Sequence, residues 1–574
     1  MPANESASKL NGAGLDRSVN AALAQLTGGI SPVALNLAYT DWLQHLMLSP
    51  DKQLELFIEG MRNWQALWAL GAQPAAAVPA GAEDKRFADP AWQSWPFNLY
   101  RQSFVLTQAW WKQATTGIPG VARHHEDVVS FITRQLLDSI APTNFAATNP
   151  VVLDQAAREG GANFVRGACN AVQDVQRTTA GAPPVGTEAF VVGKNVAATP
   201  GSVIFRNRLI EVIQYTPTTP DVYAQPILIM SAWIMKYYIL DLSPENSLVR
   251  YLVAAGHTVF VISWKNPTAD DRDLGFDDYR QLGFMAALDA VTAIVPQQPV
   301  HAVGYCLGGT LLAIAAAAMA RDGDNRIASL TLFAAQTDTT QAGEIMLFID
   351  DAQVQFLEDM MAERGYLEGR QMLAAFQLLR SNDLIWSAMV QEYLLGKRAP
   401  MFDLMAWNAD STRMPARMHS EYLRTLFLNN DLAAGRFVVG GRPISLRDIR
   451  LPIFAVSTVT DHVAPWKSVY KIQELTETEV TFVLSNGGHN VGVVNPPGTP
   501  HRHYQLAVHA AATNALDAER WQATAPLHDG SWWPAWTDWL ERRSGTRVPP
   551  PAFGAPAAGY AVLGDAPGTY VFDR

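Results

Sequence analysis

One short segment, residues 301–310, constrains the fold of this chain more than any other feature. It reads His-Ala-Val-Gly-Tyr-Cys-Leu-Gly-Gly-Thr, with an apolar strand end before Cys306 and a strong helix former after it. Gly304 and Gly308 flank the cysteine, and their lack of a side chain lets a strand and a helix approach closely at a sharp turn. Such a turn exposes its central side chain, so the sequence predicts that Cys306 is a nucleophile.

Cys306 has two interpretations, which differ in what surrounds the thiol. Free cysteine is among the most frequently buried residues, so an isolated cysteine would favour a structural role. Here the apolar, alanine-rich stretch 310–319 predicts a helix whose N-terminal amides point back at the sulfur and stabilise negative charge on it. Together with the flanking glycines, this favours the nucleophile. A thiol in this position suits exchange chemistry on thioesters.

An acid and a base follow Cys306 along the chain, each directly after a predicted strand. Asp461 comes after the apolar strand 452–457, and His489 lies in a glycine-rich loop after the strand 480–484. Where a nucleophile occupies this kind of turn, the acid and the histidine follow it in that order at one edge of the sheet. We therefore expect Cys306, Asp461 and His489 to form a catalytic triad.

Two other residues compete for these roles. His462 is adjacent to Asp461, but it begins the segment after the turn, so we expect it to hydrogen-bond locally. Asp338 follows the strand 327–334 and is an alternative acid. Its position between two threonines suits a turn or a helix cap instead.

Further apolar runs predict an α/β domain over residues 186–574. The runs 209–214, 227–230 and 258–262 lead into the strand before Cys306, and intervening helices would call for a mostly parallel sheet. Residues 337–450 lack this rhythm and are rich in Met, Phe and Leu at helical spacing. They predict a helical cap inserted over the site.

The N-terminal region, residues 1–185, predicts a mainly helical domain that ends at a breaker-rich linker, 178–186. We expect roughly the first 30 residues to be disordered. One predicted helix carries apolar side chains at helical spacing, namely Leu54, Phe57, Ile58, Met61, Trp64, Leu67 and Trp68. Such a face either packs on other helices or contacts an apolar surface outside the chain.

Composition excludes several classes of protein. The formal net charge is −11 at pH 7 and no basic cluster is present, which argues against nucleic acid as a partner. Two cysteines, Cys169 and Cys306, in 574 residues argue against a disulfide framework and fit a reducing cytoplasm. The longest apolar run, 311–320, is too short for a transmembrane segment, and no targeting segment is visible. The histidines lack partners at ligand spacing, so we expect no metal.

Many segments besides the Cys306 turn resemble those of the polyhydroxyalkanoate synthases, and they occur in that family's order. The segments are Lys236-Tyr-Tyr-Ile-Leu-Asp241-Leu-Ser-Pro-Glu-Asn246, Ser263-Trp-Lys-Asn-Pro267, Asn382-Asp-Leu-Ile-Trp386, Tyr393-Leu-Leu-Gly-Lys397, Trp407-Asn-Ala-Asp-Ser-Thr-Arg413, Asp461-His-Val-Ala-Pro-Trp466, Gly487-Gly-His489-Asn-Val-Gly492 and Gly530-Ser-Trp-Trp-Pro534. The similarity runs from about residue 149 to residue 540. The length and the N-terminal extension are most similar to the class I type.

This resemblance implies an α/β-hydrolase core with a helical cap and a helical N-terminal domain. It implies an acyltransferase that polymerises (R)-3-hydroxyacyl-CoA into polyester and releases CoA. Cys306 would carry the acyl group as a thioester with His489 as base, and Asp461 would help to activate the 3-hydroxyl of the incoming unit. Because CoA is part of the substrate and a product, we expect no further cofactor.

The resemblance also implies where the enzyme works and with what. It suggests a homodimer in the cytoplasm, at the surface of a granule of nascent polyester, with a cap that moves and also forms the dimer contact. The apolar helical face in residues 54–68 would suit contact with that polyester.

An oxyanion site needs two backbone donors. We expect one to be the N–H of Leu307, directly after the nucleophile, and the other to lie near Trp233 or Ile234 in the loop after the strand 227–230. The family commonly has Pro-Pro-x-Ile-Asn-Lys in this loop, whereas this chain reads Ser-Ala-Trp-Ile-Met-Lys over residues 231–236. Met235 replaces the asparagine, so no role of that amide carries over.

Two other functions share parts of this pattern. A hydrolase that uses cysteine on esters or lactones would need the turn and the triad, but it gives no reason for the cap and C-terminal segments. A non-catalytic granule-coating protein would keep the fold, but the intact Cys306, Asp461 and His489 argue against it.

Overall fold

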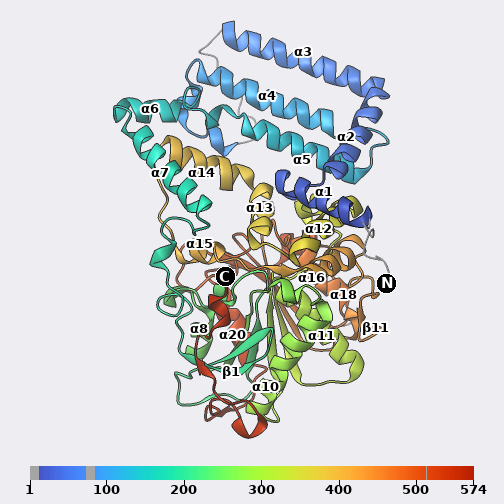
Figure 1. Ribbon diagram of the computed structural model, residues 1–574, viewed down its shortest axis with the longest axis vertical. Helices are drawn as coiled ribbons and strands as arrows, with labels where there is room; N and C mark the ends of the chain where they lie inside the picture. The colour runs from blue at the N-terminus through green and yellow to red at the C-terminus, as the bar shows by residue number, and fades with distance from the viewer. Residues whose placement is uncertain (1–11, 73–83, 512) are drawn as a thin grey trace, which may run out of the picture. The chain divides into compact units, whose positions relative to one another are not determined.

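The computed structural model describes residues 12–72, 84–511 and 513–574 (Figure 1). These residues fall into two compact units. The sheet unit contains residues 12–23, 186–373 and 401–574 of those described, and the helical unit contains residues 24–185 and 374–400. The chain passes from the helical unit to the sheet unit at residue 186.

Residues 374–400 differ from the expectation, because the sequence placed them in the cap and the structure places them in the helical unit. Polar contacts within that unit hold them there. The Asn163 side-chain amide donates to the Leu394 carbonyl at 2.8 Å, and Arg398 pairs with Asp174 at 2.8 Å. Hydrophobic spacing cannot reveal such long-range pairs.

The N-terminal segment also differs from the expectation. Helix α1 (Gly12–Leu26) forms where the sequence predicted disorder. Its Asn20 amide donates to Asp359 Oδ2 at 2.7 Å, and Asp359 belongs to helix α12 (Asp351–Arg364) of the sheet unit. Residues 1–11 of the predicted disordered stretch lie outside the described residues.

The sheet unit is built on an 11-stranded sheet, as counted over the described residues, with strand order β15-β14-β13-β12-β7-β6-β4-β5-β2-β1-β17. The central strands from β13 to β5 are parallel, and the flanking strands on both sides pair antiparallel. The bounds are β1 (Gly201–Arg206), β2 (Ile210–Tyr215), β4 (Ile227–Met230), β5 (Val259–Trp264), β6 (Val300–Tyr305), β7 (Ile327–Phe333), β12 (Ile453–Thr458), β13 (Val480–Ser485), β14 (His503–His509), β15 (Leu527–Asp529) and β17 (Gly564–Asp565). Every strand predicted from the sequence overlaps one of these, and the prediction of a parallel central sheet is confirmed.

Helices cover the central strands, which explains their continuous apolar sequences. Strands β4, β5, β6, β12 and β13 are buried at every position, as expected for parallel strands with helices on both faces. Helices α8 (Leu248–Ala254), α10 (Ala286–Ile294) and α11 (Leu307–Asp322) pack on this core. In Figure 1, α10 and α11 lie along the sheet.

Helix α20 (Trp533–Glu541) and the residue before it connect the sheet to the loop that follows His489. The indole of Trp532, the residue before the helix, donates to the Gly492 carbonyl at 2.9 Å, and that of Trp533 donates to the Val493 carbonyl at 3.0 Å. Trp536 donates to Thr331 Oγ1 on β7 at 3.0 Å. Three buried tryptophans therefore fix the loop after His489 against the sheet.

The insertion between β7 and β12 is largely helical, as predicted. Within the sheet unit it contains α12, α15 (Asp403–Asn408), α16 (Ala416–Glu421) and the π-helical turn η12 (Tyr422–Leu428). A second segment of the insertion, residues 374–400, belongs to the helical unit. Residues of η12 line the cavity beside Cys306.

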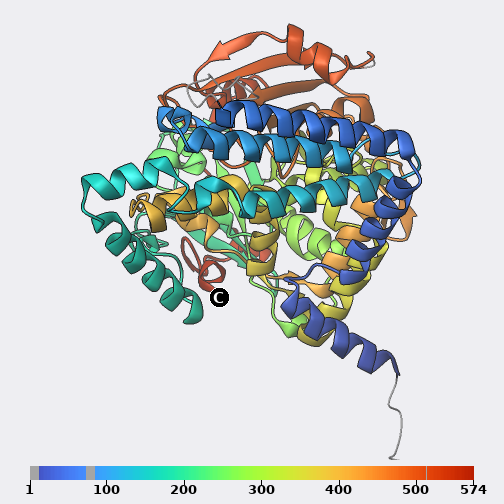
Figure 2. The same cartoon turned by 90° about the horizontal axis from the view of Figure 1, so that it is seen from above.

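The helical unit contains a layer of long helices that lie side by side in Figures 1 and 2. They are α3 (Pro50–Ala72), α4 (Phe97–Thr115) and α5 (Arg123–Ser139). Helix α2 (Pro32–Met47) packs on α5. Phe104 of α4 and Leu137 of α5 form a small core with Phe87, Trp92 and Ala141.

The outer face of α3 is apolar and exposed. Phe57, Trp64 and Trp68 are 66%, 59% and 70% exposed, and the two indoles stack at 5.6 Å. The opposite face packs on α4, where the Trp110 indole donates to the Leu56 carbonyl at 2.9 Å. Packing within the described residues therefore accounts for only one face of this helix. No helix in the described part of the chain is long and apolar enough to cross a bilayer.

Candidate active site

Cys306 lies at the junction of β6 and α11, where the sequence placed a sharp turn. Its backbone has φ 53° and ψ −125°, a strained conformation for a residue with a side chain. The Cys306 N–H donates to the Phe333 carbonyl of β7 at 2.8 Å, and its carbonyl accepts the N–H of Gly309 at 2.9 Å. The neighbouring strand and the helix thus hold the strained turn.

The two predicted glycines are required by close backbone contacts. A Cβ at Gly304 would lie 2.4 Å from Gly309 Cα. A Cβ at Gly308 would lie 2.3 Å from the Met230 carbonyl oxygen at the end of β4. Neither backbone can shift without moving the strand, so only glycine fits at these positions.

Asp461 and His489 meet at the ends of β12 and β13, as predicted. His489 Nδ1 lies 2.7 Å from Asp461 Oδ2. Asp461 Oδ1 accepts the backbone N–H groups of Val463 at 2.9 Å and Ala464 at 2.8 Å. The Asp461 side chain is fully buried, so these donors replace the water that the carboxylate has lost.

The electrostatics of His489 connect the pair to Cys306. Burial alone lowers the pKa of His489, but the Asp461 carboxylate and the Cys306 sulfur raise it by more. The pKa of His489 therefore lies well above its ordinary value. A protonated imidazole beside a cysteine sulfur stabilises the thiolate, which is the reactive form.

Asp338, the alternative acid, occupies a turn outside the pair. Asp338 accepts the N–H of Thr340 at 2.8 Å and its hydroxyl at 2.6 Å, and Lys471 Nζ lies 3.3 Å away. This is the turn role that the sequence favoured for it. His489 Nδ1 lies 2.7 Å from Asp461, and its pKa is raised by both Asp461 and Cys306.

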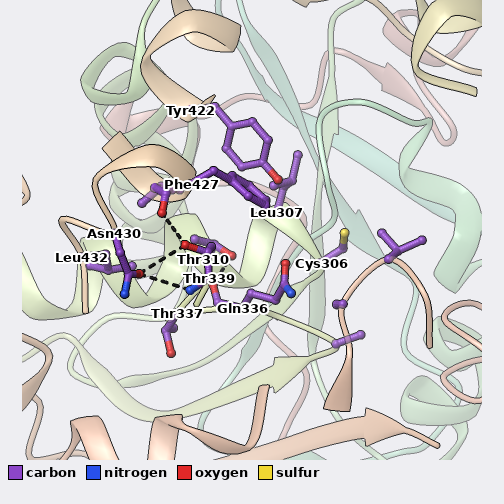
Figure 3. A pocket seen from close by; sticks show the side chains of 14 residues that line it. Cys306, Leu307, Thr310, Gln336, Thr337, Thr339, Tyr422, Phe427, Asn430 and Leu432 are labelled. Carbon is purple, nitrogen blue, oxygen red and sulfur yellow. Dashed lines mark hydrogen bonds between the residues drawn. The ribbon is translucent and has the colours of Figure 1, made fainter. Parts of the chain in front are cut away.

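A small cavity, with a volume of about 30 Å³, opens beside Cys306 (Figure 3). Its walls come from the turn after β6, the loop after β7, the cap turn η12 and the loop after β12. The lining residues are Cys306, Leu307, Thr310, Ala334, Gln336, Thr337, Thr339, Tyr422, Leu426, Phe427, Asn430, Leu432, Val463 and Ala464. On the cap side, the apolar Leu426, Phe427 and Leu432 stand beside the polar Tyr422 and Asn430.

Comparison with known proteins places the chain in a family. Residues 12–52 match the family described as "Poly-beta-hydroxybutyrate polymerase N terminal", residues 83–252 match "Poly-beta-hydroxybutyrate polymerase (PhaC) N-terminus", and residues 225–496 match "alpha/beta hydrolase fold". The chain is 42% identical to the Poly(3-hydroxyalkanoate) polymerase of Methylorubrum extorquens, over 92% of this chain and 88% of that protein. It belongs to the poly(3-hydroxyalkanoate) polymerase family.

Other members of the poly(3-hydroxyalkanoate) polymerase family match over similar lengths. The subunit PhaC of Rhizobium meliloti (strain 1021) is 40% identical over 92% of this chain and 86% of that protein. The subunit PhaC of Cupriavidus necator is 34% identical over 92% of this chain and 90% of that protein. The family resemblance and the α/β-hydrolase fold expected from the sequence are therefore confirmed.

In this polymerase the predicted oxyanion loop lies against the start of α11. The Cβ position of Gly308 is 2.7 Å from the Ser231 carbonyl oxygen, so the loop after β4 passes directly beside Leu307. The carbonyls of Trp233 and Ile234 accept the hydroxyl and the N–H of Thr412 at 2.6 and 3.1 Å. The loop is thus fixed, and its role as oxyanion donor stays a prediction.

Several residues near the polymerase site were missed in the sequence. The Tyr305 hydroxyl donates to Asn490 Oδ1 and so ties the residue after His489 to the residue before Cys306. The Tyr422 hydroxyl points towards the Cys306 end of the cavity in Figure 3, and burial raises its pKa. Asn490 could have been found from its place beside His489. Tyr422 and Asn430 could not, because no strand-end rule applies in the cap.

The described residues contain no group of three or more His, Cys, Asp or Glu side chains that could hold a metal ion.

Proposed function

We propose that this chain polymerises (R)-3-hydroxyacyl units from CoA thioesters into polyester, with Cys306 as the covalent acyl carrier, and releases CoA. The observation that carries the proposal is the contact of His489 with both Asp461 and Cys306, at the strained turn between β6 and α11. Membership of the polymerase family gives the class of product. The geometry of the site supports the covalent mechanism.

The first step is acyl transfer to sulfur. His489 takes the proton of the Cys306 thiol, and the thiolate attacks the carbonyl carbon of the acyl-CoA. The bond between that carbon and the CoA sulfur then breaks, and His489 returns the proton to the departing CoA. One thioester replaces another, so this step changes little in free energy.

The second step forms the ester bond. The 3-hydroxyl of one unit gives its proton to His489 and attacks the thioester carbonyl carbon of the other unit. The bond from that carbon to sulfur then breaks, and the sulfur leaves as a thiolate that takes the proton back from His489. Both Asp461 oxygens are already engaged, one by two backbone N–H groups and the other by His489. This supports activation of the hydroxyl through His489, with Asp461 holding the ring and stabilising its charge.

The tetrahedral intermediate in each step carries a negative oxygen. We assign the N–H of Leu307 as one donor to it, because that residue begins α11 directly after the nucleophile. The second donor belongs to the fixed loop after β4, near Trp233 or Ile234. Preorganised backbone donors of this kind cost no rearrangement when the charge develops.

The cavity walls support transfer to a hydroxyl over hydrolysis. Leu426, Phe427 and Leu432 of the cap region face the space beside Cys306. An apolar wall keeps water away from a thioester that must wait for an alcohol.

The exposed face of α3 supports a place at the polyester surface. Phe57, Trp64 and Trp68 present aromatic area that nothing else in the helical unit covers among the described residues. Aromatic faces of this kind bind apolar surfaces by burying area. We propose on this ground, and on the family resemblance, that the enzyme acts as a homodimer at the surface of cytoplasmic polyester granules.

The test is incubation of the purified protein with (R)-3-hydroxybutyryl-CoA, with continuous detection of released CoA thiol and separation of the product by size. We expect CoA release together with high-mass polyester, and neither with Cys306→Ala. Release of CoA with only free 3-hydroxybutyrate would make the protein a hydrolase. If no CoA appears, longer 3-hydroxyacyl-CoA substrates decide between a different chain length and an inactive site.

A further inference from the structure

Gln336 lies beside the nucleophile in a position that the mechanism above does not use. It follows β7, and its side chain points towards Cys306 in the cavity (Figure 3). The backbone around it is fixed. Thr310 Oγ1 on α11 donates to the Gln336 carbonyl at 2.8 Å, and Ala334, two residues earlier, has φ 47° with its N–H donating to the Val456 carbonyl at 2.7 Å.

The side-chain nitrogen of Gln336 has no hydrogen-bond partner among the described residues. Its Nε2 atom is buried, and a buried donor without an acceptor costs about 1–3 kcal/mol. Native proteins keep few such groups, and a cavity beside a reactive sulfur is where a ligand would satisfy one.

The other polar groups of the cavity wall are mostly occupied. Asn430 Oδ1 accepts the N–H and the hydroxyl of Thr339, at 3.1 and 3.3 Å. Thr310 uses its hydroxyl on the Gln336 carbonyl. Thr337 Oγ1 is also unpaired in the described structure, but in Figure 3 that side chain points away from Cys306. Besides the Tyr422 hydroxyl on the cap side, the buried Gln336 Nε2 is therefore the donor that the loop after β7 offers to an acyl group on the sulfur.

The strand order separates this donor from the oxyanion site. In the sheet, β4 lies on one side of β6 and β7 lies on the other. The loop proposed to stabilise the thioester oxygen follows β4, whereas Gln336 follows β7. If an acyl group on Cys306 turns its carbonyl oxygen towards β4, the rest of its atoms point away from β4. The next oxygen along a 3-hydroxyacyl unit is the one on C3.

We propose that the Gln336 amide donates a hydrogen bond to the oxygen on C3 of the acyl unit held by Cys306, and so selects 3-hydroxyacyl groups over unsubstituted acyl groups. This inference rests on the proposed function. The C3 oxygen accepts a hydrogen bond whether it is a free hydroxyl or an ester oxygen of the growing chain, so one residue serves both states. A site built around such a bond rejects a substrate that lacks the oxygen, because the buried donor is left unpaired.

The test compares two substrates in the first turnover, (R)-3-hydroxybutyryl-CoA and butyryl-CoA, by rapid detection of released CoA. The wild type should prefer the hydroxylated substrate in kcat/KM. Gln336→Met keeps the length of the side chain and removes the amide. It should lower the preference about tenfold, through loss of the hydroxylated substrate alone. Gln281→Met, at an exposed glutamine of the same unit, is the matched control and should keep the wild-type preference.

Gln336→Glu tests the same bond without relying on one variant, since a carboxylate of the same size accepts where the amide donates. It should reduce the preference at least as much as Gln336→Met, and thermal unfolding identifies a variant that fails to fold. The assignment is overturned if folded variants keep the wild-type preference, or if the wild type itself does not distinguish the two substrates. If the wild type releases CoA from neither substrate nor from longer 3-hydroxyacyl-CoA, the proposed function fails, and this inference fails with it.

Discussion

Asp461 Oδ2 lies 2.7 Å from Nδ1 of His489, and these two atoms join the loops that follow β12 and β13. The hydrogen bond fixes the ring so that its other side faces Cys306. It also places the buried Asp461 carboxylate beside the ring. That negative charge raises the pKa of His489, whereas burial lowers it. The geometry of the site depends on this pair more than on any other contact.

Replacing Asp461 by Asn should separate the two steps of the reaction. The amide keeps the shape but removes the charge, so His489 becomes a weaker base for the hydroxyl. We expect a first release of CoA to remain and elongation to fall at least about 100-fold. Polymer yield and CoA release on the same samples measure this. Asp338→Asn makes the same chemical change at the turn and should elongate polymer near the wild-type rate, whereas wild-type elongation by Asp461→Asn would refute the role assigned here.

Replacing Gly308 by Ala should destabilise the sheet unit. The new Cβ would meet the Met230 carbonyl oxygen at 2.3 Å, which forces β4 and α11 apart. We expect a loss of more than about 2 kcal/mol in the free energy of unfolding. Chemical denaturation checks this. Gly564→Ala on β17 is the matched control, because nothing lies within 4 Å of its Cβ position. An unchanged midpoint for Gly308→Ala would contradict the packing.

Two buried histidines should make the fold sensitive to acid. Burial, with His301 and Arg547 nearby, lowers the pKa of His257 to about 3, and burial, with Arg543 nearby, lowers the pKa of His301 to about 4. The unfolded chain takes up protons near the ordinary histidine pKa, about 6.5, while the folded chain does not. The contribution of these two histidines to the free energy of unfolding is therefore fully present above that pH. It falls as the pH drops towards the folded pKa values.

His257→Phe isolates this effect. The variant removes one titrating ring and should reduce the loss of unfolding free energy between pH 6.5 and pH 5 by about 2 kcal/mol. The slope of stability against pH is the measurement, so a constant offset from repacking does not matter. His503→Gln changes an exposed histidine and should leave the slope as it is. An identical slope for His257→Phe and the wild type would show that His257 does not resist protonation in the fold.

Removing aromatic area from α3 should weaken attachment to polyester. The double variant Trp64→Ser, Trp68→Ser should bind poly(3-hydroxybutyrate) particles at least about tenfold less tightly in a sedimentation assay, because each indole contributes a large apolar area. Val508→Ser, Leu527→Ser removes exposed apolar side chains from β14 and β15 and is the control. Equal loss in both double variants would mean that attachment is unspecific.

The sequence predicted those parts of the site that follow strand ends. Cys306, Asp461 and His489 each stand directly after an apolar run, and local patterns of strand, glycine and polar residue are enough to locate them. The same rule fails in the cap, since Tyr422 and Asn430 come from a π-helical turn and the loop after it, where spacing does not indicate which side chain faces the sulfur. Gln336 follows β7 directly, but its importance depends on an unpaired atom that no sequence pattern shows.

Long-range polar pairs explain the errors in the domain prediction. Residues 374–400 look like any helical insertion in the sequence, and the contacts of Asn163 and Arg398 are needed to assign them to the helical unit. Likewise α1 has a weak pattern of its own, and its contact with Asp359 supplies order that local propensity does not.

The most direct measurement is the location of the acyl group on the protein. The Asp461→Asn variant, mixed with (R)-3-hydroxybutyryl-CoA and stopped in acid, is digested and its peptides are weighed by mass spectrometry. The account predicts a hydroxybutyryl adduct on the peptide that contains Cys306 and none on the peptide of Cys169, the exposed second cysteine. CoA release without an adduct on Cys306, or an adduct that persists in Cys306→Ala, would contradict the covalent mechanism.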